Sequence, residues 1–257
     1  MIVLVFYGQA ISVCCSIRYG FLADSFGSRN LPGTVYGFIG SSLFIGYGAV
    51  FFFKLTERAM TRMNSRDLLA GTMVAYFVIQ LATGFTYMLQ DNIVMVTLSF
   101  FLRTLQGVFA YPGYLVPLDF INANFESEFD FVHGLLNMGY FSGHGVAEIL
   151  GCWMYDHFGY EAAYAFSAAI ALTSVIIVLL IIPKSRTYLS TQEEKIEESF
   201  SHKKTLTMFL IIPMLATMCI NANYGVLQVT RLEHLITSLL RIGTNSWCPH
   251  CMLQNIF

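Results

Sequence analysis

Long apolar stretches, separated by short clusters of charged residues, constrain this chain more than any other feature of its sequence. They match the roughly 20 apolar residues that a helix needs to cross a bilayer core about 30 Å thick. Only 12% of the residues are charged, whereas roughly 25% are charged in ordinary soluble domains. Inside lipid the backbone must satisfy its own hydrogen bonds, which leaves helices or closed barrels. Because barrel strands would be short and alternating, the sequence predicts an all-α integral membrane protein.

The positions of the apolar stretches divide the chain into four parts. Residues 1–183 hold six expected spans and form an N-terminal bundle, and residues 184–204 form a polar linker. A seventh span follows at 205–229, and the tail, 230–257, is too polar to cross a membrane. We expect the first six spans at residues 2–20, 34–53, 68–89, 93–118, 132–154 and 162–182.

Basic residues lie mainly on one side of the expected spans. The opposite side holds Arg29, with Arg18 near the end of the first span. Because loops rich in Lys and Arg face the cytoplasm, we expect a cytoplasmic amino terminus and a cytoplasmic linker. The loop 119–131 is expected on the same side, although it has no Lys or Arg. The basic residues of the richer side are Lys54, Arg58, Arg62, Arg66, Lys184, Arg186, Lys195, Lys203 and Lys204.

Chemistry that would indicate an enzyme is missing from the sequence. It contains no cluster of metal-ligating residues, no nucleophile triad and no glycine-rich phosphate loop. We therefore expect no enzymatic activity, no cofactor and no metal. The net charge of −2 gives no reason to expect a nucleic acid partner. The expected partners are the lipid bilayer and a small-molecule solute.

Two cytoplasmic or membrane-embedded segments resemble motifs of one transporter family. Residues 53–66 are similar to a basic loop of the pattern G-x-L-a-D-r-x-G-r-k, although Phe53 stands near its first glycine. Residues 103–107 read R-T-L-Q-G, similar to the pattern R-x-x-Q-G of a fourth span. A rival match to the basic loop, at residues 20–29, is closer by letter. Spacing favours 53–66, because one span should separate the loop from the fourth-span arginine.

The fifth expected span resembles an antiporter motif of the same family, G-x-x-x-G-P-x-x-G-G. Ala147 and Glu148 replace its Gly-Pro step, and Cys152 replaces its last glycine. Residues 34–39 are similar to the start of the second span in vesicular amine and polyamine carriers. Together these segments resemble the major facilitator superfamily.

The resemblance implies a specific fold and a missing part. Carriers of this superfamily have two six-helix halves around a central site. We therefore expect the N-terminal half of such a carrier plus a seventh helix, with the C-terminal half missing. On this interpretation the chain stops early, or the tail 230–257 comes from a mistaken gene model.

Four polar residues in the expected spans are candidates for a transport or proton pathway. Arg103 lies about 15 Å into the fourth span, near the midplane, and Gln106 follows it by one turn. Arginine at this depth costs about 2.5–3.5 kcal/mol, so it should face the protein interior. It either binds backbone carbonyls or belongs to the pathway, where proton coupling is expected. Glu148 and His144 share one face of the fifth span.

Both interpretations of the fifth-span residues stay open. Glu148 lies at about 9 Å depth, close enough to the depth of Arg103 that we expect a contact between them. It either carries a proton or is a neutral acid bonded within the bundle, and His144 is either a relay or a packing residue.

Two further groups are expected to act in gating and packing. The basic loop either anchors the topology or stabilises a cytoplasmic gate through Lys54, Arg58, Arg62 and Arg66. Glycines let helices approach closely, and four of them follow one another in the fifth span: Gly139, Gly143, Gly145 and Gly151.

The leading functional hypothesis is a secondary active carrier that moves a small organic solute, such as an amine or polyamine, by alternating access. The main alternative is an inactive or regulatory half-carrier, because one half lacks the facing wall of the site. A seven-helix receptor fits only the helix count and would need an extracellular amino terminus. Vesicle and plasma membranes are both open as locations.

Overall fold

The computed structural model describes residues 1–184, apart from the side chains at positions 19, 20, 22–24, 33, 36, 52 and 53. Every regular element in this part of the chain is a helix. The predicted linker beyond residue 184, the seventh span at 205–229 and the tail at 230–257 lie outside the described residues.

Six long helices occupy the positions of the six predicted spans, which confirms the all-α membrane fold for the described residues. Among these residues, α5, α6 and α8 are long and apolar enough to cross a membrane by length and composition. The long helices are α1 (Ile2–Ser16), α3 (Gly33–Phe53), α5 (Ser65–Thr86), α6 (Asn92–Asn124), α7 (Phe129–Phe158) and α8 (Tyr160–Ile181). The short elements are η1 (Ile17–Gly20), α2 (Leu22–Gly27), α4 (Leu55–Met60) and η2 (Glu126–Glu128).

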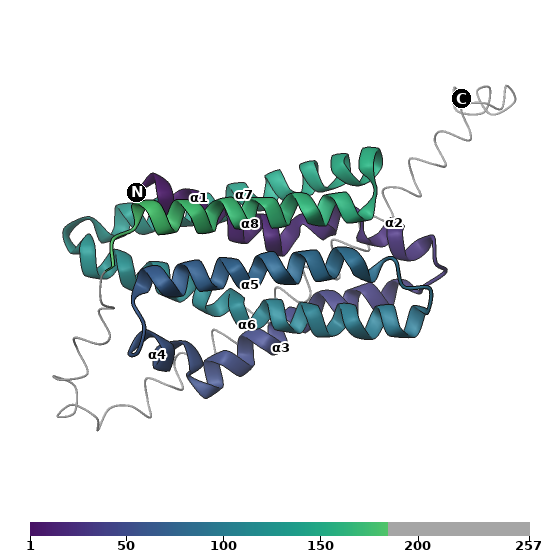
Figure 1. Ribbon diagram of the computed structural model, residues 1–257, viewed down its shortest axis with the longest axis horizontal. Helices are drawn as coiled ribbons and strands as arrows, with labels where there is room; N and C mark the ends of the chain where they lie inside the picture. Colours follow the sequence, from purple (N-terminus) through teal and green to yellow (C-terminus); the bar gives the residue numbers. More distant parts are fainter. Residues whose placement is uncertain (185–257) are drawn as a thin grey trace, which may run out of the picture.

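The long helices form two groups of three (Figure 1). In one group α1 packs against α7 and α8, and in the other α6 packs against α3 and α5, while the α5–α8 contact joins the groups. If the first three spans (α1, α3 and α5) are matched in order to the last three (α6, α7 and α8), the contact between α1 and α7 corresponds to the contact between α6 and α3. The packing therefore has the pattern of two three-helix repeats. The carriers that the sequence resembles place such repeats in inverted orientation.

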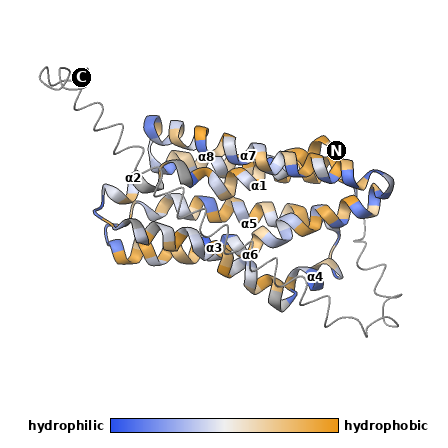
Figure 2. Ribbon diagram, turned by 180° about the vertical axis from the view of Figure 1, so that it is seen from behind, coloured by the Kyte–Doolittle hydropathy of each residue, from blue (hydrophilic) through white to orange (hydrophobic). Residues whose placement is uncertain are grey.

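Apolar side chains cover much of the lateral surface of the bundle. Hydrophilic residues gather at turns near its ends, with apolar residues along the helices between them (Figure 2). Phe141 and Leu180, for example, are 77% and 78% exposed. Exposure of this kind suits a helix bundle that is surrounded by lipid.

The closest helix crossing joins α3 and α6 at two glycines. A Cβ atom at Gly46 would collide with the carbonyl oxygen of Thr104, and one at Gly107 would collide with that of Leu43. Only residues without a side chain permit this backbone approach. The contact fixes α6, and with it Arg103, against the second span.

Several helix ends differ from the prediction. The first span is interrupted, because α1 ends at Ser16 and the chain continues as the 3₁₀ helix η1. The fourth span is longer than expected, because α6 continues to Asn124 through Asp119, which is buried within the bundle. The predicted loop 119–131 therefore shrinks to a turn around η2, and α7 already begins at Phe129.

The order of elements agrees with the spacing on which the placement of the basic loop was based. Residues 20–29 lie between the first and second spans, whereas α5 alone separates the loop around α4 from α6. The assignment of residues 53–66 to the family's basic loop stays a prediction. Arg29, from the rival segment, caps the chain just after α5. It donates hydrogen bonds to the carbonyl oxygens of Tyr87 and, at 2.7 Å, Leu89. Its guanidinium carbon also lies 4.5 Å from the centroid of the Tyr87 ring.

Candidate functional site

A buried polar cluster lies inside the bundle where α1 ends. We call it the arginine–glutamine cluster, and its side chains are Arg18 of η1, Gln80 of α5, and Arg103 and Gln106 of α6. None of the four is more than 3% exposed. Polar groups buried this deeply are costly unless they are hydrogen-bonded, so their partners define what the cluster does.

Gln106 is the centre of the cluster. Its side-chain oxygen accepts hydrogen bonds from Arg103 at 2.5 Å and from Arg18 at 3.3 Å. Its side-chain nitrogen donates to the carbonyl oxygen of Cys14 at 2.6 Å. One amide group therefore joins two guanidinium groups to the backbone of α1.

The other members of the cluster bind the same end of α1. Arg103 donates to the carbonyl oxygen of Cys15 at 2.9 Å. Gln80 donates to the carbonyl oxygen of Cys14, and also to the Ser167 hydroxyl of α8 at 3.0 Å. The last carbonyls of a helix lack intrahelical donors and carry partial negative charge. The cluster thus caps the end of α1 inside the bundle, where the chain continues as η1.

Of the two interpretations of Arg103, the carbonyl-binding one describes its geometry. Arg103 lies 11 residues beyond the start of α6 at Asn92, hence about 17 Å along the helix. Its role in a transport pathway stays a prediction.

The expected contact between Glu148 and Arg103 is wrong. Among the described residues, Glu148 has no hydrogen bond and no ion pair. A difference in depth is not the reason. Because α7 continues to Phe158, Glu148 lies about 15 Å from the end of its helix rather than the predicted distance of about 9 Å. This is close to the distance of about 17 Å between Arg103 and the start of α6. The reason is rotation: Ala147 faces the bundle interior with 0% exposure, and the next residue points about 100° away.

His144 approaches the cluster more closely than Glu148. Its Nδ1 atom shares a hydrogen bond with the hydroxyl of Ser16, the last residue of α1, which is 0% exposed. His144 is therefore the predicted pathway residue of α7 that touches the interrupted end of α1.

The glycines of α7 do not all face the same neighbour. A Cβ atom at Gly139 would lie 2.5 Å from the Val5 carbonyl oxygen, one at Gly143 would lie 2.7 Å from that of Gln9, and Gly151 faces η1 in the same way. The prediction that Gly145 is a packing glycine is wrong, because nothing lies within 4 Å of its Cβ position. It is two residues from Gly143 and so falls about 200° around the helix.

The basic loop is a packed element rather than an open chain. Within it, α4 buries Thr56 and Met60, and Glu57 accepts a hydrogen bond from the Tyr111 hydroxyl of α6 at 3.1 Å. The predicted gating residues Lys54, Arg58 and Arg62 are exposed, whereas Arg66 is half-buried and pairs with Asp67 at 3.5 Å.

The family follows from a comparison with known proteins. The family model described as Major Facilitator Superfamily matches residues 1–242 of the 257-residue chain. The chain belongs to the Major Facilitator Superfamily. A search of curated proteins finds no match for it. Members of this superfamily are membrane transporters rather than enzymes, so the chain is a multi-pass membrane protein of a transporter family.

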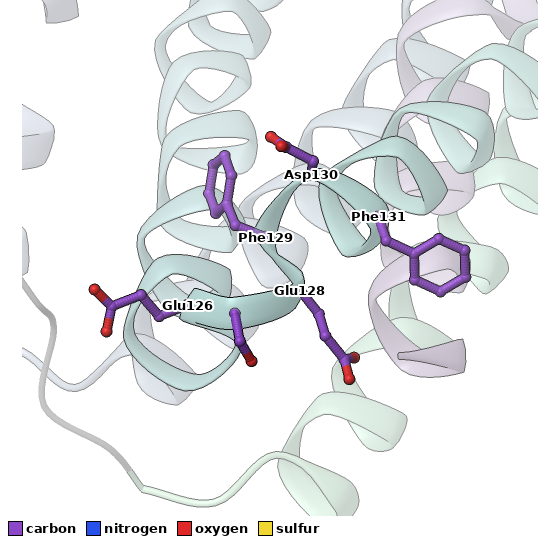
Figure 3. Close-up of a pocket in the computed structure, with 6 residues that line it drawn as sticks. Glu126, Glu128, Phe129, Asp130 and Phe131 are labelled. Carbon is purple, nitrogen blue, oxygen red and sulfur yellow. The ribbon is translucent and has the colours of Figure 1, made fainter.

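A pocket at the α6–α7 turn does not resemble a transport site of this superfamily. It has a volume of about 460 Å³ and is lined by Glu126, Ser127, Glu128, Phe129, Asp130 and Phe131. All six residues come from one continuous segment at the surface, and the three carboxylates point in different directions (Figure 3). They do not converge on a common ligand position.

Sequence reasoning does not find two residues of the cluster. In the sequence, Arg18 is a charge near the end of the first expected span, and Gln80 lies within the apolar stretch of the third. A signal existed for Gln80, because amide side chains within a membrane span are hydrogen-bonded to other helices. No comparable signal indicated that Arg18 turns inward.

Proposed function

We propose that this member of the Major Facilitator Superfamily is a secondary active carrier that moves a small organic solute by alternating access. The observation that carries the proposal is the arginine–glutamine cluster at the interrupted end of the first span. Solute and coupling-ion sites of such carriers lie near the membrane midplane and are typically formed by discontinuous helices. A second six-helix half would supply the facing wall of the site.

An amine or polyamine is the proposed solute. Support comes from residues 34–39, which resemble the start of the second span in vesicular amine and polyamine carriers. A cationic solute also suits a pathway that contains a carboxylate. Glu148 supplies one on α7, and the ring of His144 lies four residues earlier on the same helix.

Glu148 is the proposed site of proton exchange. It is half-buried and accepts no hydrogen bond from another described residue, so no described residue holds its carboxylate in a fixed position. His144 would relay between this face of α7 and Ser16 at the end of α1. Arg103 and Gln106 would hold the broken end of α1 in place while the site changes its exposure.

The proposed orientation places the amino terminus and the α4 loop in the cytoplasm. It is supported by the excess of Lys and Arg on that side. In this orientation the exposed residues Lys54, Arg58 and Arg62 lie at the cytoplasmic mouth of the carrier, where they would contact the second half.

Counterflow tests the carrier assignment. Proteoliposomes that hold a full-length carrier containing this half are loaded with unlabelled spermidine or serotonin, diluted into labelled solute, and followed over time without an ion gradient. A carrier transiently accumulates label above equilibrium, because each outward solute is exchanged for an inward one. Uptake no greater than in protein-free liposomes, for both an amine and a polyamine, would overturn the proposal.

A further inference from the structure

A proline within α6 frees one backbone carbonyl group. Proline has no N–H, so Pro117 leaves the carbonyl oxygen of Gly113, four residues earlier, without its intrahelical donor. The hydroxyl of Tyr140, on α7, donates a hydrogen bond to this oxygen at 2.7 Å. The side chain from the neighbouring helix therefore replaces the missing intrahelical bond.

The same segment of α6 has other features of a bend. Gly113 lacks a side chain where Ile11 of α1 packs, and a Cβ atom there would lie 2.7 Å from the Ile11 Cδ1 atom. A second proline, Pro112, precedes it directly. Sharp helix bends occur at prolines and at positions where a side chain enters the hydrogen-bond ladder. Both causes are present between residues 112 and 117.

Tyr140 also ties α7 to the first span. Its main-chain carbonyl oxygen accepts a hydrogen bond from the Ser12 hydroxyl of α1 at 2.6 Å. Its ring lies 5.6 Å from that of Tyr114 on α6. One residue thus connects α1, α6 and α7, and α1 and α6 are the helices that correspond to each other in the two repeats.

We propose that residues 113–117 are a hinge in α6 and that the Tyr140 hydroxyl is its latch. With the bond made, the Gly113 carbonyl has a donor and the hinge is held against α7, which is bound to α1 through the main chain of Tyr140. With the bond broken, the Gly113 carbonyl has no donor in its own helix and the end of α6 from Leu118 to Asn124 bends independently. The hinge assumes nothing about the solute, so it goes beyond the proposed function and is tested without transport.

Hydrogen exchange of the purified chain in detergent micelles tests the latch. Tyr140→Phe removes only the hydroxyl group and keeps the ring. Loss of one hydrogen bond should speed exchange of the amides at residues 118–121 by about fivefold, because local opening becomes easier. Tyr114→Phe is the matched control, because its hydroxyl reaches the His133 side chain at 3.4 Å rather than a backbone group. It should leave these amides unchanged.

Restoring the missing N–H decides the mechanism. Pro117→Ala gives Gly113 an intrahelical donor, so these amides should exchange more slowly, and adding Tyr140→Phe should then change their rates by less than about twofold. Four results would overturn the latch: unchanged exchange in Tyr140→Phe, an equal acceleration in Tyr114→Phe, unchanged or faster exchange in Pro117→Ala, or a full Tyr140→Phe effect in the Pro117→Ala background. The Pro117→Ala result stands by itself even if Tyr140→Phe does not fold.

Discussion

Replacing Gln106 with leucine removes the centre of the arginine–glutamine cluster while nearly preserving side-chain volume. The change deletes the hydrogen bonds to Arg103, Arg18 and the Cys14 carbonyl. Side-chain hydrogen bonds between membrane helices contribute about 0.6 to 1.7 kcal/mol each, so losing three should lower the free energy of unfolding by about 2–5 kcal/mol. Titration of the purified protein in mixed micelles with sodium dodecyl sulfate measures this free energy.

Two variants give this prediction its controls. Gln9→Leu removes a glutamine of α1 that makes one exposed hydrogen bond, to the Ser142 hydroxyl at 2.9 Å, and should cost less than about 1 kcal/mol. Gln106→Glu keeps an acceptor for both guanidinium groups, and Gln80 still binds the Cys14 carbonyl, so it should cost less than Gln106→Leu. If Gln106→Leu costs no more than Gln9→Leu, the cluster does not hold α1 in place.

Three further predictions concern packing, orientation and proton coupling. Gly107→Ala should lower the free energy of unfolding in the same titration by about 1–3 kcal/mol through overpacking, while Gly145→Ala stays within about 0.5 kcal/mol; equal effects would contradict the crossing geometry. In a background without other reactive cysteines, Met63→Cys should react with an impermeant maleimide only from the cytoplasmic side, and Phe158→Cys only from outside. The reverse labelling pattern would contradict the proposed orientation. In a full-length carrier that contains this half, Glu148→Gln should abolish uptake driven by a pH gradient and retain solute exchange, so normal driven uptake would make this acid structural.

The helix positions were predictable because span length and charge placement depend on sequence alone. Apolar stretches of the right length gave all six long helices of the described residues. The ends were less predictable, because Pro117 and Asp119 are typical of a helix end. Tertiary packing overrides that signal: both residues are buried within the bundle, and α6 continues past them to Asn124.

The candidate site was harder to predict, because it depends on the rotation of each helix about its axis. Sequence spacing placed His144 and Glu148 on one face of the fifth span, but not the direction of that face. Gly139 and Gly143 set this direction by packing on α1, which leaves Glu148 beside the interior rather than in it. The break in α1 was likewise unpredictable, because partners on α5 and α6 cap it.

Uptake against a concentration gradient tests the central claim most directly. Proteoliposomes that hold the carrier receive labelled amine or polyamine under an imposed pH gradient, in each direction in turn. The account predicts accumulation above the outside concentration in one direction, which collapses when nigericin abolishes the gradient. Accumulation that never exceeds that of protein-free liposomes, in either direction and for every amine tested, would contradict a proton-coupled carrier of organic amines.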